Sequence, residues 1–168
     1  KFRTFILVAA FTGMRASELR GLRWSDVDFD NRQISINQRA DAWQDIGSPK
    51  SAKGRRRIPL PPFVADELKV WKTDCPASKL DLVFPTGNGN LEYHANMANR
   101  WFGNPQKAAK ILNADGDPKY SGLHCLRHFY ASFCINPKSV GGLELPAKVV
   151  QEWLGHSSIT VTLDTYGH

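Results

Sequence analysis

The sequence has few cysteines and no stretch suited to a membrane or to secretion. Cys75, Cys125 and Cys134 are its three cysteines, and their spacing contains no CxxC pair. An odd number cannot pair completely, so a small disulfide-stapled scaffold is excluded and reduced, buried thiols are expected, as in cytosolic proteins. No apolar run approaches the length that crosses a bilayer, so no membrane partner is expected, and no segment resembles a secretory signal. Internal repeats and low-complexity tracts are also lacking, which excludes repeat architectures.

The composition is that of one globular domain with an excess of positive charge. The 168 residues are 42% hydrophobic and 23% charged, which suffices for a single core. Lysine and arginine outnumber aspartate and glutamate by 22 to 16, a net charge of +6. This balance favours an anionic partner, of which nucleic acid is the commonest. Because the sequence begins at Lys1 and not at methionine, we expect it to be a fragment of a longer chain.

A small sheet is predicted in the first half of the sequence. Residues 26–29 and 33–37 alternate polar and apolar side chains, and Asp30-Asn31 between them is typical of a turn. A third strand is expected at residues 57–60 (RIPL), where two prolines follow. The pattern therefore predicts a three-stranded antiparallel sheet between residues 24 and 60.

Helical patterns dominate elsewhere, which predicts an α+β domain that is mainly α-helical. Helices are expected at residues 2–12, 16–22, 62–73, 94–112, 121–135 and 146–154, with a last short helix that begins near Ser157 or Ser158 and carries Tyr166. Gly13 and Gly155 are expected to end two helices, and Ser121 to cap one. A break or kink is expected near Gly103-Asn104-Pro105.

A basic run lies between two of the predicted strands. Residues 50–57 (KSAKGRRR) contain five basic side chains and no acidic one. Charge runs are most often solvated, flexible loops. Here a hairpin would instead hold the run out as a rigid basic finger, which suits contact with phosphates or insertion into a groove.

The segment 122–128 (GLHCLRH) places two polar side chains on one helix face. His124 and Arg127 are three residues apart, so they share a face. An apolar stripe adjoins them, formed by Leu123, Leu126, Tyr130 and Phe133. We therefore expect the stripe to anchor the helix and His124 and Arg127 to lie at its edge, although a plain surface pair has the same pattern. A zinc site using His124, Cys125 and His128 is disfavoured, because Cys125 is rotated away and no fourth ligand has the usual spacing.

Two further segments carry candidate residues. In residues 12–19 (TGMRASEL), Arg15 opens a helix and Glu18 lies three residues on, within reach of the guanidinium. In residues 154–166 (LGHSSITVTLDTY), His156 follows a glycine helix stop and Tyr166 lies on the next helix. Each feature alone has an ordinary structural explanation, since such ion pairs are common and most tyrosines are core or surface aromatics.

Together, two arginines, two histidines, a lysine and a tyrosine suit phosphodiester chemistry without a metal or other cofactor. Arginines can grip two non-bridging phosphate oxygens with paired hydrogen bonds. A lysine can donate a proton to a leaving oxygen. A tyrosine can attack phosphorus once its proton is removed, its ordinary pKa being about 10.

The order of these motifs resembles that of the tyrosine recombinases, the phage integrase family. TGMRASEL, the basic run at Lys50, HCLRH, LGHSS and the terminal Tyr166 follow one another as in that family, and the resemblance extends from Arg3 to His168. It implies that residues 1–168 form the catalytic domain with the tyrosine-recombinase catalytic fold. It also implies an enzyme that cuts and rejoins DNA.

The resemblance implies a role for each matching residue. Arg15 and Arg127 would clamp the scissile phosphate and stabilise its charge in the transition state. Glu18 would orient Arg15. His124 and His156 would hydrogen-bond phosphate oxygens, and His124 would accept or relay the tyrosine proton.

The remaining roles concern the nucleophile and the basic run. Tyr166 would form a 3′-phosphotyrosyl bond and release a 5′ hydroxyl, which conserves the bond energy so that rejoining needs no ATP. Lys50 would protonate the leaving 5′ oxygen, with Lys53 as a rival because the register of the hairpin is open. DNA-backbone contacts are expected from Lys53, Arg55, Arg56 and Arg57.

The resemblance also implies partners and a setting. We expect double-stranded DNA at attachment sites as partner, a homotetramer when two duplexes are joined, and a cytoplasmic, nucleoid-associated location. The amino-terminal DNA-binding domain and a carboxy-terminal docking segment are expected to be missing from this fragment, which is then monomeric. The connection at residues 136–145 is longer than the usual short turn. Phage or mobile-element integration and excision fits best. The alternatives are a type IB topoisomerase-like or telomere-resolving enzyme, a non-catalytic DNA-binding module, and a metal-dependent nuclease.

Overall fold

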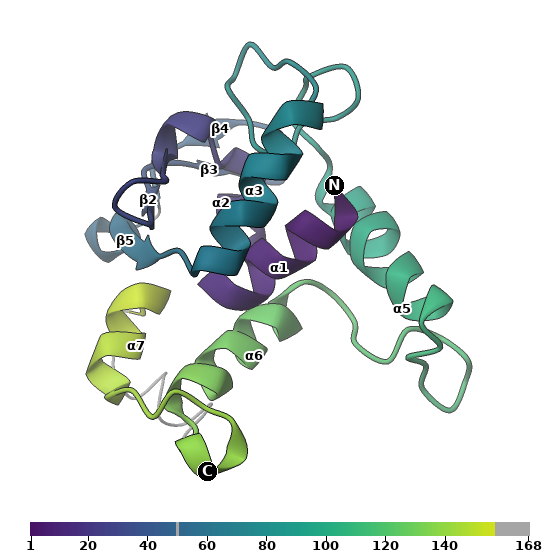
Figure 1. The fold of residues 1–168 in the computed structure, drawn as a ribbon. Helices are drawn as coiled ribbons and strands as arrows, with labels where there is room; N and C mark the ends of the chain where they lie inside the picture. The colour runs from purple at the N-terminus through teal and green to yellow at the C-terminus, as the bar shows by residue number, and fades with distance from the viewer. Residues whose placement is uncertain (50, 157–168) are drawn as a thin grey trace.

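The computed structural model describes residues 1–49 and 51–156 and shows helices grouped around one central helix (Figure 1). That helix, α1 (Phe2–Thr12), packs against α3 (Pro62–Asp74), α6 (His124–Ile135) and the π-helical segment η3 (Met97–Gly103). Phe5 of α1 meets Phe84 and Trp101 edge-on, at ring-centroid distances of 5.4 and 5.2 Å. The apolar character of α1 thus makes it the centre of the core, as its sequence predicts.

The predicted three-stranded antiparallel sheet is confirmed. Its strands are β1 (Val27–Asp28), β2 (Gln33–Ile36) and β5 (Arg56–Pro59), in the order β1-β2-β5. Ile34 pairs with Ile58, and both are fully buried, whereas Arg57 and Pro59 on the alternate positions are exposed. The two-residue period of a strand places these apolar residues on one face, which the core covers.

A second, two-stranded sheet was not expected. The strands β3 (Arg39–Ala40) and β4 (Ile46–Gly47) pair in antiparallel fashion within the long connection from β2 to β5. That connection also holds the 3₁₀ turn η2 (Ala52–Gly54). The basic run is therefore not the tip of a β2–β5 hairpin, because the β3–β4 hairpin and η2 lie between those strands.

Most predicted helices are present, with two corrected boundaries. The short helix α2 (Ala16–Gly21) follows Gly13, whose φ of 61° ends α1 as predicted. The helix α6 begins at His124 and not at Ser121, and no side chain caps it. Gly122 has a φ of 71°, which keeps Ser121 out of the helix.

The predicted helix at residues 94–112 is shorter and continuous through the expected break. It consists of α4 (His94–Asn96), the π-helical η3 and α5 (Asn104–Ala108). The wider π turn meets α5 where Pro105 occupies its first turn, a position that needs no amide donor. Lys110, with a φ of 57°, then turns the chain out of the helix.

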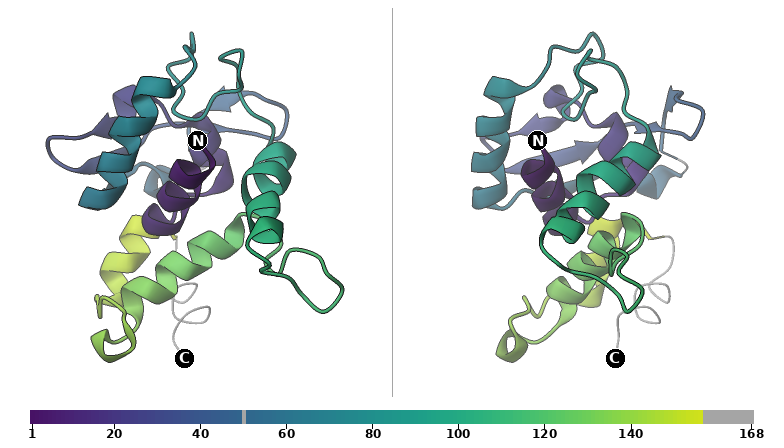
Figure 2. Two further views of the ribbon diagram at one scale, coloured as in Figure 1. Left: turned by 45° about the vertical axis from the view of Figure 1, so that its right-hand side comes forward. Right: turned by 90° about the vertical axis from the view of Figure 1, so that its right-hand side faces the viewer.

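The carboxy-terminal part packs as a smaller unit below α1 (Figure 2). It contains α6, the 3₁₀ turn η4 (Lys138–Val140) and α7 (Ala147–Leu154), which Gly155 ends with a φ of 66° as predicted. The connection at residues 136–145 folds back on α6, since the amide of Leu145 donates to the carbonyl oxygen of Cys134 at 2.8 Å. Gly13 joins this unit to α1: a Cβ there would lie 2.4 Å from the Tyr130 ring.

Two further expectations concern the cysteines and the membrane. All three cysteines are free thiols, Cys134 buried and the other two half-buried. Another 3₁₀ turn, η1 (Trp24–Asp26), precedes β1. In the part of the chain that the structure describes, no helix has both the length and the apolar character needed to span a bilayer.

Candidate active site

Three arginines from different elements bind the carboxy-terminal end of α7. Arg56 Nε, Arg127 Nη2 and Arg15 Nη2 donate to the successive carbonyl oxygens of residues 153–155, at 2.5, 2.6 and 3.1 Å. The last carbonyls of a helix have no partner within it and carry partial negative charge, so guanidinium donors suit them. The end of α7 is thus fixed to β5, to α6 and to the start of α2.

Glu18 links two of these arginines from within the protein. Its carboxylate accepts from Arg56 Nη1 and Nη2 at 2.9 and 2.8 Å, and from Arg15 Nη1 at 3.0 Å. The Arg15 amide also donates to Glu18 Oε2 at 2.8 Å. Burial disfavours the charged carboxylate, but the two arginines more than offset this, so the pKa of Glu18 lies below its ordinary value. The predicted contact between Glu18 and Arg15 is present.

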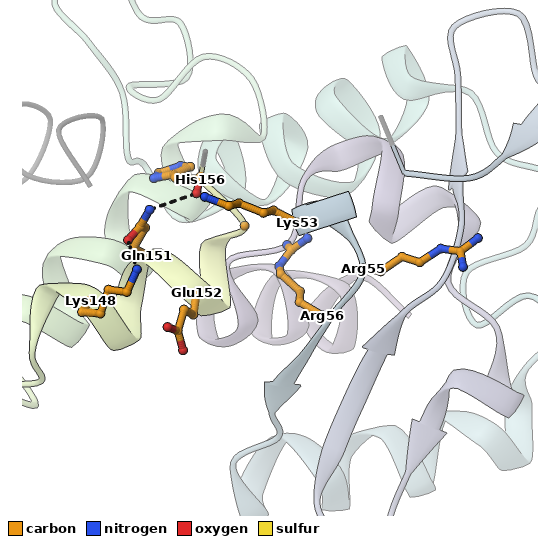
Figure 3. A pocket seen from close by; sticks show the side chains of 8 residues that line it. Lys53, Arg55, Arg56, Lys148, Gln151, Glu152 and His156 are labelled. Carbon is orange, nitrogen blue, oxygen red and sulfur yellow. Dashed lines mark hydrogen bonds between the residues drawn. The ribbon is translucent and has the colours of Figure 1, made fainter. Parts of the chain in front are cut away.

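Arg56 requires a correction, because it lies inside the site and not on a DNA-facing surface. Only 6% of its side chain is exposed, and its guanidinium also donates to the carbonyl oxygen of Gly54 at 3.0 Å. Arg55 and Arg57 are exposed, and Arg55 extends away from the others in Figure 3. Strand alternation explains the difference, since Arg56 points to the same side as buried Ile58.

Arg127 is also more deeply placed than its sequence predicts. The residue is 1% exposed, and Nη1 donates to the carbonyl oxygen of Gly13 at 2.7 Å. It therefore lies beneath the site and not at the edge of α6. His124, one turn earlier, is exposed as expected, and its ring meets that of His128 edge-on at 4.6 Å. Partial burial, followed by His128, Arg127 and Arg15, lowers the pKa of His124.

His156 lies directly beyond the fixed end of α7. Its amide donates to the Gln151 carbonyl oxygen, and Gln151 Nε2 donates to the His156 carbonyl oxygen, both at 3.2 Å (Figure 3). Burial and then the charges of Arg127, Arg15, Arg56 and His124 lower the pKa of His156 to about 4. The imidazole is therefore neutral at pH 7. Gln151, which braces it, was missed because nothing in the sequence marks a buried glutamine five residues away.

A cleft of about 250 Å³ opens beside His156. It is lined by Lys53, Arg55, Arg56, Lys148, Gln151, Glu152, Gly155 and His156. Lys53 is exposed on η2 and extends toward His156 in Figure 3. A Cβ on Gly155 would lie 3.0 Å from the Lys53 carbonyl oxygen, so the absence of a side chain on Gly155 lets η2 pack closely against the end of α7.

Two predicted catalytic residues, Lys50 and Tyr166, lie outside the described residues. Of the others, the structure brings together Arg15, His124, Arg127 and His156 from three segments, with Lys53 at the cleft. Within residues 1–49 and 51–156, no group of three or more His, Cys, Asp or Glu side chains could hold a metal ion. Cys125, considered for zinc, has its sulfur 3.2 Å from the Gly122 carbonyl oxygen.

The arrangement favours an anion. Three guanidiniums gather here, and two of them, those of Arg15 and Arg56, pair with the buried Glu18 carboxylate. Burial, and then the neighbouring positive charges, favour the neutral forms of the two imidazoles beside them. A neutral imidazole can donate one hydrogen bond and accept another. A phosphate group at this site would therefore meet both charge and hydrogen-bonding partners.

Comparison with known proteins agrees with this geometry. The model of the phage integrase family matches residues 1–168. A tyrosine recombinase XerC-like protein of Caldanaerobacter subterraneus subsp. tengcongensis is 28% identical over all of this chain and 46% of its own. The transposase from transposon Tn916 of Enterococcus faecalis is 29% identical over 97% of this chain and 41% of its own.

Solved structures show the same fold. The Tn1549 transposon integrase, in complex with circular intermediate DNA, superposes with a TM-score of 0.78 and 26% identity, covering 98% of this chain and 55% of that one. The predicted tyrosine-recombinase catalytic fold is thereby confirmed. The chain spans about half the length of the curated relatives it matches. With the family model matching from end to end, the chain belongs to the phage integrase family.

Proposed function

We propose that residues 1–168 are the catalytic domain of a site-specific DNA recombinase, a DNA strand transferase that integrates and excises a phage or other mobile element. The observation that carries this proposal is the gathering of Arg15, His124, Arg127 and His156 into one positively charged site. The relatives named for recombination and transposition, and the DNA in the Tn1549 complex, support the same function.

In the proposed reaction the described residues hold the scissile phosphate. Arg15, whose side chain is 38% exposed, reaches a phosphate oxygen, while buried Arg127 supplies positive charge from below. His124, whose pKa is lowered, and His156, which is neutral at pH 7, hydrogen-bond the remaining oxygens. Such charge placed in advance stabilises the five-coordinate phosphorus more than the ground state.

The covalent step exchanges one phosphoester for another. The Tyr166 oxygen forms a bond to phosphorus as the bond to the 5′ oxygen breaks. His124 takes the tyrosine proton, and Lys50 or Lys53 gives a proton to the departing 5′ oxygen. Attack by a 5′ hydroxyl reverses the sequence and restores the DNA backbone. The number of phosphoester bonds is unchanged, so rejoining needs neither ATP nor a cofactor.

The setting of the reaction is part of the same proposal. Double-stranded DNA with attachment sites is the substrate, and four active sites act together when two duplexes are joined. The protein would work in the cytoplasm, associated with the nucleoid. Contacts to the DNA backbone are assigned to Lys53, Arg55 and Arg57, whose side chains are exposed.

A trapping experiment tests the proposal. The full-length protein is incubated with a nicked suicide substrate that carries the attachment site, and denaturing gels detect protein joined to the 3′ end. Tyr166→Phe is expected to abolish the adduct and to leave DNA affinity nearly unchanged, because only a hydroxyl group is removed. Tyr120→Phe, at an exposed tyrosine on the connection that precedes α6, is the matched control and should form the adduct.

Three outcomes would contradict the proposal. An adduct in the Tyr166→Phe protein would remove Tyr166 from the nucleophile position. Cleavage without any adduct that depends on added metal would indicate a nuclease, and DNA binding without any cleavage would indicate a binding module.

A further inference from the structure

The β3–β4 hairpin, residues 39–47, is an element that the proposed chemistry does not use. Asp41 organises its turn: the Asp41 side chain accepts from the amides of Trp43 and Asp45 at 2.9 and 3.0 Å. The Asp41 amide in turn donates to the Asp45 carbonyl oxygen at 2.9 Å. Hydrogen bonds of this kind define the backbone conformation of the turn and place Trp43 at its tip.

A buried arginine fixes this hairpin to α2. Arg20 is 3% exposed and donates to the carbonyl oxygens of Asp41 at 2.7 Å and Glu92 at 2.8 Å, and to the side chain of Gln44. Gly21 lies against the strand, since a Cβ there would be 3.0 Å from the Arg39 backbone. The helix that Arg15 opens therefore also sets the position of the hairpin.

Trp43, at the tip, is 84% exposed. The tryptophan at this turn gains nothing from the protein's own core, and tryptophan is a residue type enriched at binding interfaces. Trp43 lines a hollow of about 560 Å³ together with Arg15, Arg39, His94 and His124. The indole thus lies on the same face as the candidate catalytic residues.

Arg39, at the base of the hairpin, has an unsatisfied donor. Its Nε is buried and has no hydrogen-bond acceptor among the described residues. Buried donors without a partner are rare in native proteins and require an explanation. Arg39 lines both the hollow beneath Trp43 and a second hollow that Arg15 and Ser51 share, so an anion there would lie between the two arginines.

We propose that the β3–β4 hairpin is a DNA-contacting element, in which Arg39 binds a backbone phosphate next to the one held by Arg15 and Trp43 stacks on a nucleobase. The lining of the hollow favours nucleic acid over protein, because its charged side chains are basic except Asp41 and Asp41 is occupied by backbone amides. A flat indole beside guanidiniums matches a base beside its phosphate. The inference rests on the proposed function and names a contact that the catalytic residues do not provide.

Fluorescence anisotropy tests the proposal. It measures the binding of the full-length protein to an intact, fluorescein-labelled duplex that carries the attachment site. Trp43→Ala should weaken binding by about tenfold, and Trp43→Phe should keep most of the affinity because an aromatic face remains. Arg39→Gln should lower the slope of log affinity against log salt by about one, as loss of one phosphate contact does. Phe129→Ala and Arg3→Gln, at exposed positions on α6 and α1, are the matched controls and should bind as wild type.

Tryptophan fluorescence gives a direct signature of stacking. DNA should quench the emission of the wild-type protein, and the quenched component should be missing in Trp43→Phe, which retains the other four of the five tryptophans in residues 1–168. Because Trp43 is exposed, its variants should fold normally, and circular dichroism checks this. Wild-type affinity and quenching in both Trp43 variants would overturn the proposal.

The remaining outcomes separate this proposal from the others. Trp43→Ala protein that binds DNA normally but loses self-association on DNA would assign the hairpin to a protein partner and overturn the inference. If the wild-type protein formed no covalent adduct in the trapping experiment, the proposed function would be wrong, but the inference about the hairpin would still be open to test. Quenching and salt slopes would still report whether the hairpin contacts DNA, since neither requires cleavage.

Discussion

Replacing Arg56 with methionine is expected to lower the free energy of unfolding by about 3–5 kcal/mol, the usual cost of removing one partner of a buried ion pair. The structure explains the size of the effect. Glu18, 3% exposed, would lose both hydrogen bonds from Arg56 and keep only those from Arg15. The carbonyl oxygens of Trp153 and Gly54 would lose their arginine donor as well. The free energy of unfolding of a typical domain is about 5–15 kcal/mol, so a loss of this size is easily measured.

The neighbouring arginines provide the control. Arg55→Met and Arg57→Met change the same side chain on exposed positions and should stay within about 0.5 kcal/mol of wild type. Urea unfolding followed by circular dichroism gives the three values, with equal slopes confirming a common unfolded state. The double variant Glu18→Leu and Arg56→Met should lose less free energy of unfolding than the sum of the two single variants. In each single variant one member of the pair stays buried without the other, whereas the double variant removes both.

The pH dependence gives a second check on the same pair. The folded pKa of Glu18 is below its ordinary value of 4.5, so its stabilisation is present above that pH and lost as the pH falls through the folded pKa. The difference in free energy of unfolding between wild type and Arg56→Met should therefore become smaller at acidic pH. If Arg56→Met unfolds at the same urea concentration as Arg55→Met, the reasoning about a buried ion pair is wrong.

Three other outcomes are expected. His156 should titrate near 4 by NMR, and a titration near 6.5 would contradict its burial beside positive charges. Because the folded state then binds fewer protons than the unfolded chain, the free energy of unfolding should fall as the pH drops from about 6.5 toward 4. Neutralising Arg55 and Arg57 together should flatten the salt dependence of DNA binding, and an unchanged slope would remove them from the phosphate contacts. The 168-residue chain should be monomeric by light scattering without DNA, and a stable tetramer would contradict this expectation.

Much of the fold follows from local patterns. The alternation around Ile34 and the proline pair after β5 were enough for the three-stranded sheet, and glycines marked the ends of α1 and α7. The β3–β4 hairpin was not predicted, because two-residue strands are too short to show a periodic pattern. The continuity of the helix around Pro105 was not predicted, because a π-helical segment lets the chain pass the proline without a break.

The candidate site was predictable in its members but not in its depth. The order of motifs named Arg15, His124, Arg127 and His156, and the structure brings them together. The burial of Arg127 depends on carbonyl oxygens of Gly13 and Leu154, far away in the sequence, so no local pattern could reveal it. Arg56 was the exception, since strand alternation with Ile58 would have separated it from its exposed neighbours.

The arginines that bind the end of α7 donate to its backbone carbonyls, which has a consequence for how this region can vary. Different side chains at positions 153 and 154 leave the acceptor atoms in place, so the clamp tolerates substitution wherever packing allows. Insertion or deletion is another matter. One residue added within α7 would rotate its last carbonyls by about 100° and move them along the axis, away from all three donors together. The length of this helix, counted from Pro146 to Gly155, is therefore constrained more tightly than its composition.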